Sequence, residues 1–305
     1  MNRLRNEQRG QAIVMTVVSL TALIACVGFT VDVGSWYRAH RQAQQTADAA
    51  ALAGAQALPG DTAQATVLAQ DYADKNGSGI DAVGGITFRT AFNPNDTVAV
   101  KVTHTAPGFF AKLFGIDSVD VHAVAAARTG VPIAVKGGAP IVVSKYNPML
   151  AGPGCPCFHQ DTTLPLSDVG APGGYGLINL APDQQNVGQS DLANWVQYGL
   201  NAYLGIGKYV QETGSKFNGN ATGDALNARL GTDLLFPVYD SLVAQGTNAQ
   251  YNIIGWVAFH LTSFDKNSGN NWTLHGYFTS VIWDGIQSKS NPTPDFGVHT
   301  IALVN

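Results

Sequence analysis

The longest apolar stretch of the chain lies close to its N-terminus, where residues 12–31 carry no charged side chain. Arg3, Arg5 and Arg9 precede this stretch, and Asp32 follows it. About 20 residues in a helix, at about 1.5 Å each, match a hydrocarbon core of roughly 30 Å. The pattern predicts a membrane-spanning helix. The basic flank predicts a cytoplasmic N-terminus, with everything after Asp32 outside the cytoplasm.

Two alternatives to a retained membrane anchor stay open for this segment. A cleaved secretory signal usually has an apolar core of about 7–15 residues and a small-x-small cleavage site, and no clean site precedes Asp32. A lipoprotein signal would use Cys26 as its acylated residue, because residues 23–26 resemble a lipobox. The sequence stays apolar over residues 27–31, whereas a lipoprotein usually turns polar there. We favour the retained anchor, in which Cys26 is a small buried side chain.

The end of the apolar stretch carries features of a membrane exit. Asp32 either pairs with a cation on a neighbouring helix or marks the water interface, and we favour the second interpretation. Trp36 and Tyr37 follow four and five residues later, which is typical of aromatic side chains anchored at the level of lipid head groups.

Small residues continue the helical pattern beyond this point. Alanine, the strongest helix former, dominates residues 42–58, and no proline occurs before Pro59. A stripe of small residues recurs at three- and four-residue steps on one face: Ala43, Ala47, Ala50, Gly54 and Ala57. We expect this helix-packing stripe to contact a partner protein, another copy, or the chain's own first domain, and we favour the last.

The next 70 residues or so predict a small α+β module. Asp61 is a candidate cap for a helix over 62–75. Alternating apolar residues predict strands over 86–92, 98–103 and 119–128. Pro107 opens a short helix over 109–114, and we expect its four bulky apolar residues to dock on the sheet.

Beyond a boundary near residues 130–132, the pattern predicts a β-rich domain. Short strands are expected over 133–135 and 140–145, followed by a long Gly- and Pro-rich loop over 150–176. Helices are expected over 191–204 and 224–230. A near-continuous apolar run over 253–262 predicts a strand that is covered on both faces and forms the centre of the core.

The low share of charged residues and the high glycine content bear on the class of protein. Only 12% of the residues are charged, about half of the usual share of roughly 25%, while glycine is plentiful at 34 residues. This suits an exported or filament-associated protein better than a cytosolic enzyme. The net charge is −4 and no later stretch forms a Lys/Arg patch, so nucleic-acid binding is not expected.

The cysteines and the chemical motifs point to no reaction. Cys155 and Cys157 flank Pro156 and are candidates for a local disulfide in an oxidising compartment. No nucleophile elbow, phosphate-binding loop or zinc spacing occurs, so we expect no catalytic residue, no metal ligand and no cofactor.

His260 and His275 fall in predicted strands and are expected to be core or edge residues. Core packing explains Trp195, Trp256, Trp272 and Trp283 better than sugar stacking.

Several motifs together resemble the TadE-like and TadG-like proteins of the tight-adherence (Tad/Flp) pilus assembly system. They are the Arg-Gly-Gln lead at residues 9–11, the apolar span, Asp32, and the Ala-Asp-Ala-Ala-Ala-Leu-Ala segment at residues 47–53. Segments around 236–240, 251–259 and 274–279 are similar to the β-rich part of TadG-like proteins. Prepilin processing would cut between Gly10 and Gln11, but prepilins carry Glu at the fifth position after the glycine, where this chain has Met15.

The residue patterns described above predict an α+β protein with five parts. They are a cytoplasmic basic lead (1–11), a transmembrane helix (12–31), an Ala-rich helix that extends it (32–58), a pilin-like α+β module (59–130) and a β-rich extracytoplasmic domain (131–305).

For the function, the resemblance implies a non-enzymatic, single-pass component of pilus assembly in a bacterial inner membrane. Its expected partners are other Tad or envelope proteins and possible copies of itself, with no small-molecule substrate. The alternative is a pilin-like filament subunit or adhesin whose apolar helix is buried in a polymer. A third hypothesis, a sugar-binding or enzymatic envelope lipoprotein, depends on exposed tryptophans.

Overall fold

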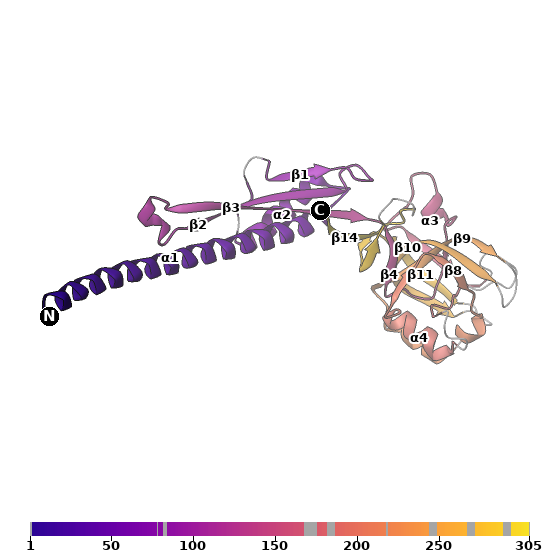
Figure 1. The fold of residues 1–305 in the computed structure, drawn as a ribbon. Coiled ribbons are helices and arrows are strands. Elements are labelled where there is room, and N and C mark those ends of the chain that lie inside the picture. The colour runs from indigo at the N-terminus through magenta and orange to yellow at the C-terminus, as the bar shows by residue number, and fades with distance from the viewer. Residues whose placement is uncertain are drawn as a thin grey trace. The chain divides into compact units, whose positions relative to one another are not determined.

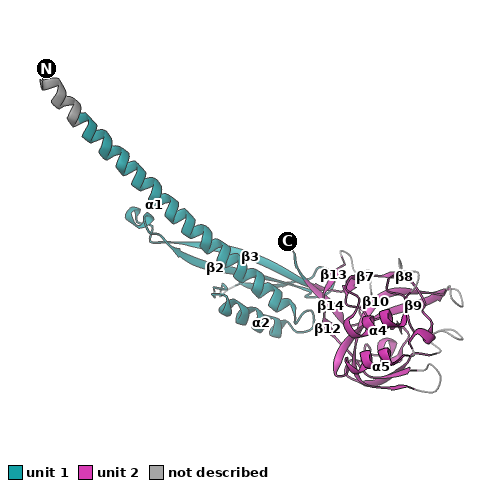
Figure 2. Cartoon of the chain, turned by 90° about the horizontal axis from the view of Figure 1, so that it is seen from below, with its two compact units in different colours: residues 1–128, 302–305 teal, residues 129–301 magenta. Residues whose placement is uncertain are grey.

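The structure is a computed structural model of the chain. It describes all residues except 1, 78, 82–83, 168–175, 182–186, 218, 244–248, 267–271, 289–293 and 305, and the side chains of residues 2–10 also lie outside the described part. The chain divides into two compact units, shown in different colours in Figure 2. Unit 1 comprises residues 1–128 together with 302–305, and unit 2 comprises Thr129–Ile301.

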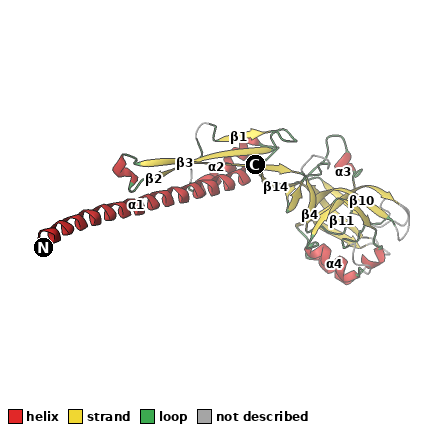
Figure 3. Ribbon diagram, in the orientation of Figure 1, coloured by secondary structure: helices red, strands yellow, loops and turns green. Residues whose placement is uncertain are grey.

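One unbroken helix, α1 (Asn2–Ala55), forms the N-terminal part of unit 1 (Figure 3). The absence of proline and the many alanines explain its length. Its two halves have different surroundings: from Gln11 to Val31 every residue except Gly28 is exposed, whereas beyond that point buried residues recur at helical spacing. By length and composition, α1 is able to cross a membrane.

The second half of α1 packs against α2 (Thr62–Lys75). The Asp61 carboxylate caps α2 by accepting a hydrogen bond from the Gln64 amide at 2.8 Å, as predicted. Three alanines spaced four residues apart form the buried face of α2: Ala65, Ala69 and Ala73. Small side chains on both helices allow the two backbones to approach closely.

Three antiparallel strands of a sheet cover α1 from another side. They are β1 (Ile86–Arg89), β2 (Thr97–Pro107) and β3 (Ser118–Gly130), and β2 and β3 pair over their length from Thr97 opposite Arg128 to Pro107 opposite Ser118. This hairpin runs alongside α1 in Figure 1. The order helix, helix, three strands agrees with the predicted elements, although β1 ends three residues earlier than expected.

The short helical segment between β2 and β3 differs from the prediction. It is a 3₁₀ turn, η1 (Ala111–Phe114), closed by Gly115 in the left-handed conformation. The expectation that its bulky apolar residues dock on the sheet was wrong, because none of the residues of η1 is buried. The turn lies at the end of the hairpin and not over a face of it.

One strand from the end of the chain was not predicted. The sheet order is β1-β2-β3-β14-β12, with β14 at Val298–Val304 and β12 at Val281–Ile282. Residues Ala302 to Val304 of β14 belong to unit 1. Unit 1 is therefore built from two segments that are distant in the sequence.

Unit 2 contains two further sheets. The larger has the order β5-β9-β10-β11-β6, and β8 also pairs with β10; the smaller has the order β13-β4-β7. The strands of the larger sheet are β5 (Val143–Ser144), β6 (Asp161–Pro165), β8 (Gly207–Val210), β9 (Thr232–Val243), β10 (Gln250–Lys266) and β11 (Trp272–Thr279). Those of the smaller sheet are β4 (Pro132–Lys136), β7 (Tyr203–Gly205) and β13 (Gly285–Gln287).

The core of unit 2 is centred on β10, as the apolar run over 253–262 predicts. Phe259 packs between Phe236 of β9 and Phe278 of β11, with ring centroids 5.6 and 5.4 Å apart. Residues on both faces of the strand, such as Trp256 and Val257, are buried. The mixture of α1, α2 and these sheets makes the protein α+β, in agreement with the sequence.

Among its described residues, unit 2 also contains four short helical segments: α3 (Pro148–Ala151), α4 (Gln189–Tyr198), η2 (Gly214–Phe217) and α5 (Asn220–Asn227). Two predictions were wrong here. The expected loop over 150–176 contains β6, and the expected helix over 191–204 ends at Gly199, whose φ of 72° is in the left-handed region. The chain then enters β7, which pairs with β4.

Candidate functional site at the junction of α1 and the β2–β3 hairpin

The carboxylate of Asp32 joins α1 to the end of the β2–β3 hairpin. It accepts hydrogen bonds from three consecutive backbone amides, at 2.7 Å from Phe109, 3.0 Å from Phe110 and 2.5 Å from Ala111. Asp32 is only 3% exposed. Hydrogen bonds to an ionised acceptor are shorter and stronger than neutral ones, so this carboxylate fixes the hairpin at one level of the helix.

Two further contacts hold the hairpin at the same place. The Trp36 indole donates a hydrogen bond to the Pro107 carbonyl at 3.3 Å. One turn before Asp32, Gly28 allows a close approach of the Phe110 side chain, because a Cβ at this position would lie 2.6 Å from Phe110 Cγ. The junction therefore extends from Trp36 back into the apolar run.

The residues that follow this junction form an exposed apolar surface. We call residues 108–117 the hairpin tip. All of its large apolar side chains are exposed: Phe109, Phe110, Leu113, Phe114 and Ile116. Leu113 and Phe114 are the most exposed of them, at 81% and 84%. Lys112, also exposed, forms an ion pair with Asp117 at 3.6 Å. The tip thus combines an anchored backbone with apolar side chains that stay largely exposed, apart from Phe110, which packs in part on Gly28 of α1.

The small-residue stripe lies within unit 1. Ala43, Ala47, Ala50 and Gly54 are buried. A Cβ at Gly54 would lie 3.0 Å from the Ala65 carbonyl of α2 and 3.5 Å from Val98 of β2. Ala57 lies beyond the end of α1, in the turn before α2. The four residues of the stripe that lie in α1 are thus buried within the chain's own first unit, the alternative that the sequence analysis favoured.

The other predicted residues of the anchor are more exposed. Tyr37 is exposed, while Trp36 is half-buried by its contact with the hairpin. The helix continues through Gly10, Gln11 and Cys26 without interruption, and Cys26 is an exposed free cysteine. Processing after Gly10 and acylation at Cys26 stay predictions, and the side chains of Arg3, Arg5, Arg9 and Gly10 lie outside the described residues.

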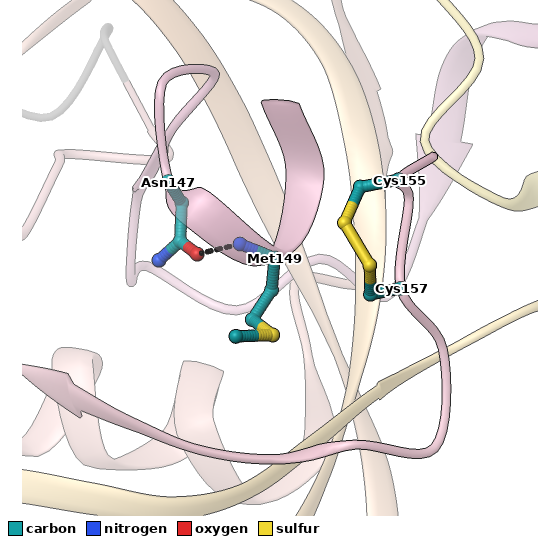
Figure 4. Close-up of a disulfide and its surroundings, with 4 residues drawn as sticks. All are labelled: Asn147, Met149, Cys155 and Cys157. Atoms are coloured by element: carbon teal, nitrogen blue, oxygen red, sulfur yellow. Dashed lines mark hydrogen bonds between the residues drawn. A yellow bond between two sulfur atoms is a disulfide. The ribbon is translucent and has the colours of Figure 1, made fainter. Parts of the chain in front are cut away.

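Cys155 and Cys157 are joined by a disulfide in unit 2 (Figure 4). The loop is held to α3, because the Cys157 amide donates to the Met149 carbonyl at 2.8 Å. Asn147 caps α3 by accepting a hydrogen bond from the Met149 amide at 2.9 Å. The disulfide therefore closes a small loop next to a capped helical turn.

The remaining candidates belong mostly to the framework of unit 2. Trp195, Trp256 and Trp272 are buried, and Trp283 donates to the Lys136 carbonyl at 2.7 Å. His260 contacts Asp233 at 2.7 Å and stacks on Tyr277, and His275 contacts Asp265 at 2.8 Å. Within the described residues, no group of three or more His, Cys, Asp or Glu side chains is arranged to hold a metal ion.

Sequence reasoning missed the partner of Asp32. It considered a cation or water, whereas the structure supplies backbone amides from residues 109–111. A usable signal was present: a lone acid directly after an apolar run, and a Pro-Gly-Phe-Phe turn between two long alternating strands. The signal does not reveal that the two features meet, because 77 residues separate Asp32 from Phe109.

A comparison with protein families finds a match for the part of this site that lies in α1. Residues 10–57 match the model of the putative Flp pilus-assembly TadE/G-like family. The matched segment includes the apolar run, Asp32 and the stripe up to Ala57. Searches of the curated proteins and of the solved structures found no match. The N-terminal helix of this protein is therefore similar, over residues 10–57, to the putative Flp pilus-assembly TadE/G-like family.

Proposed function

We propose that the protein is a membrane-anchored structural component of a Tad (Flp-type) pilus assembly system. In this proposal α1 crosses the bacterial inner membrane once, with the N-terminus in the cytoplasm. Units 1 and 2 lie outside the cytoplasm and contact other pilus or envelope proteins. The role is structural and not catalytic.

The single observation that carries the proposal is the change of environment along α1 within the family-matched segment. Before Asp32 the apolar side chains are exposed, and after Asp32 one face of the same helix is buried in unit 1. Apolar surface in water costs roughly 25 cal/mol per Å². A largely apolar run of about 20 residues, exposed everywhere except at Gly28, therefore requires a non-aqueous environment, and its length fits a bilayer.

The basic lead supports the orientation. Arg3, Arg5 and Arg9 precede the span, and lysine and arginine flanks are retained on the cytoplasmic side. The disulfide between Cys155 and Cys157 also fits an oxidising compartment for unit 2.

A filament subunit is the competing function, because a polymer of packed helices also covers an apolar helix. The two functions differ in processing. An anchor retains Met1, whereas a pilin-like subunit starts at Gln11 after cleavage behind Gly10. A lipoprotein instead starts at an acylated Cys26.

The test is intact mass and N-terminal sequencing of the protein from membranes and from sheared surface material of the same cells. A Gly10→Leu variant, which a prepilin-type peptidase does not cut, is the matched control. We expect full-length protein confined to membranes, identical for both forms apart from the substitution. A wild-type form that begins at Gln11 in sheared material, and is lost in Gly10→Leu, would replace this proposal with the filament function.

A further inference from the structure

We propose that the hairpin tip, residues 108–117, inserts into the outer lipid interface beside α1 and makes a second membrane contact for the protein. The inference rests on the proposed function, in which α1 crosses the bilayer. It adds a surface outside the family-matched segment, contributed by η1 and its flanking residues.

The first step of the argument is the level of the tip along α1. The carboxylate of Asp32, the residue at which the apolar run ends, holds the tip through the amides of Phe109, Phe110 and Ala111. Phe110 reaches further and packs at Gly28. Four residues of helix correspond to about 6 Å, so Phe110 lies about one turn inside the span when α1 crosses the membrane.

The second step is the chemistry of the exposed side chains. Leu113 and Phe114 are the most exposed large apolar residues of the described chain outside α1, and Phe109 and Ile116 extend the same surface. Exposed apolar patches of this kind mark protein or membrane contacts. Lys112 stands among them with its charge exposed, and a lysine at this level places its stem in apolar surroundings and its ammonium among head groups.

The third step identifies lipid as the occupant. Phe110 packs at Gly28, and the α1 residues on either side of it, Val27 and Phe29, are exposed, so exposed apolar side chains of the tip and of α1 occur at the same level. The surface that α1 presents there is covered by lipid in the proposed function. Since the tip is fixed to the helix at that level, the same lipid covers the tip. A separate protein partner is the alternative that the test excludes.

The experiment uses the full chain, reconstituted in vesicles of phosphatidylethanolamine and phosphatidylglycerol. A Cys26→Ser background leaves Cys155 and Cys157 paired, so that one added cysteine carries an environment-sensitive NBD label. The label is placed at Phe114→Cys and, in a separate protein, at Leu113→Cys. Val67→Cys on α2, an exposed apolar position away from the tip, is the matched control, and Leu23→Cys reports on the span itself.

We expect labels at 113 and 114 to be quenched by doxyl-labelled lipids at least threefold more than the label at 67, and protected from aqueous iodide. Shallow doxyl groups should quench 113 and 114 best, and deep ones should quench 23 best. If 23 is quenched by lipid while 113 and 114 behave like 67, the tip contact is wrong and the anchor stands. If 23 is also open to iodide, the anchor itself is wrong.

Discussion

At the scale of single residues, two aspartates organise unit 1 through backbone amides. Asp32 binds the amides of residues 109–111, and Asp96 binds those of residues 91–93. Both side chains are buried, and neither has a cationic partner among the described contacts. A carboxylate offers about four acceptor sites, so one side chain can close a turn that has no regular ladder.

Asp32→Asn should loosen the hairpin tip without unfolding α1. The substitution removes the charge and replaces one acceptor oxygen by a donor, so at least one of the three amides loses its partner. Hydrogen exchange of Phe109 to Ala111 should accelerate by about an order of magnitude. Asp48→Asn on the same helix is the control, because Asp48 accepts only from Gln44 among the described contacts. Equal exchange in the two variants would contradict this role for Asp32.

Asp96 predicts a dependence of stability on pH. Burial raises the pKa of Asp96, but hydrogen bonds from the amides of Asn93, Ala91 and Phe92 and from the Thr97 hydroxyl lower it more, so the pKa lies below its ordinary value. A lowered pKa in the folded state means that the ionised form stabilises the fold. The stabilisation is complete above about pH 4 and is lost as the pH falls through the lower folded-state pKa.

Asp96→Asn should therefore cost about 1–3 kcal/mol of unfolding free energy at pH 7, and the difference from wild type should shrink near pH 3. Calorimetry of the full chain in detergent micelles at both pH values measures it. Asp74→Asn, which removes an exposed carboxylate of α2, should change little at either pH. A loss that is equal at pH 7 and pH 3 would count against the charge of Asp96 as its cause.

At the scale of elements, α1 uses its glycines in different ways. Gly28 receives the Phe110 side chain, whereas a Cβ at Gly34 would meet nothing within 4 Å. Gly54 lies against the backbone of α2. The two close positions show where another element approaches the helix.

Gly28→Ala should displace the hairpin tip, because the new Cβ would overlap the near end of the Phe110 side chain, which cannot swing aside as a flexible tip would. Gly34→Ala is the matched control and should stabilise the helix by roughly 0.5–1 kcal/mol. Limited proteolysis within residues 108–117 is the measurement. We expect faster cleavage only in Gly28→Ala, and slow cleavage in both variants would argue that the contact does not hold the tip.

Gly54→Leu should destabilise unit 1 by about 1–3 kcal/mol or more, because the stripe on α1 has no space for a larger side chain beside Ala65 and Ala69. Gln45→Leu adds a similar side chain on an exposed position of the same helix and should be nearly neutral. Thermal unfolding of the full chain in detergent compares them. If Gly54→Leu were neutral, the packing of α1 against α2 would not require a small residue there.

At the scale of the whole molecule, the proposed function places the first part of α1 in lipid and its second part in unit 1. Val17 and Val18 are 58% and 61% exposed in the span, and Val67 of α2 is 59% exposed. Val17 and Val18 are thus about as exposed as Val67, but the proposed function places the first two in lipid and Val67 in water.

Replacing Val17 and Val18 together by arginine should cost about 5 kcal/mol or more of insertion free energy, at roughly 2.5–3.5 kcal/mol for each arginine near the centre of a span. Most of the protein should then be extracted from membranes by alkaline carbonate. Val67→Arg with Gln70→Arg adds the same two charges to the exposed face of α2 and should leave the protein in the membrane. Equal retention of both variants would mean that the helix is not a span.

Most of unit 1 could be predicted from the sequence because its signals are local. The apolar run, the cap at Asp61 and the alternation in β2 each depend on neighbouring residues. Contacts between distant segments could not be predicted, namely those of Asp32 with residues 109–111 and the addition of β14 to the sheet. The exposed position of Phe114 was also missed. The periodicity of apolar residues predicts which side chains are buried, but it does not predict which distant backbone amides donate hydrogen bonds to a buried carboxylate.

In unit 2 the prediction from sequence failed mainly at turns and short strands. The apolar run of β10 identified the centre of the core correctly, because a fully buried strand leaves a strong pattern. The short strands β6 and β7 left weak patterns, and the left-handed φ of Gly199 ended a helix that composition alone would have extended to Leu204. Glycine permits such an ending but does not require it.

The two-segment construction of unit 1 has a consequence for biosynthesis. The sequence of unit 2, Thr129–Ile301, stands between the hairpin and Ala302 to Val304. A ribosome adds about 5–20 residues per second, so these 173 residues, from 129 to 301, take about 9–35 s. During that interval α1 and the hairpin have been made, whereas Ala302 to Val304 of β14, the strand next to β3 in the sheet order, have not. An unpaired strand edge is a site for unwanted pairing, so the edge of β3 is open to such pairing until β14 is complete.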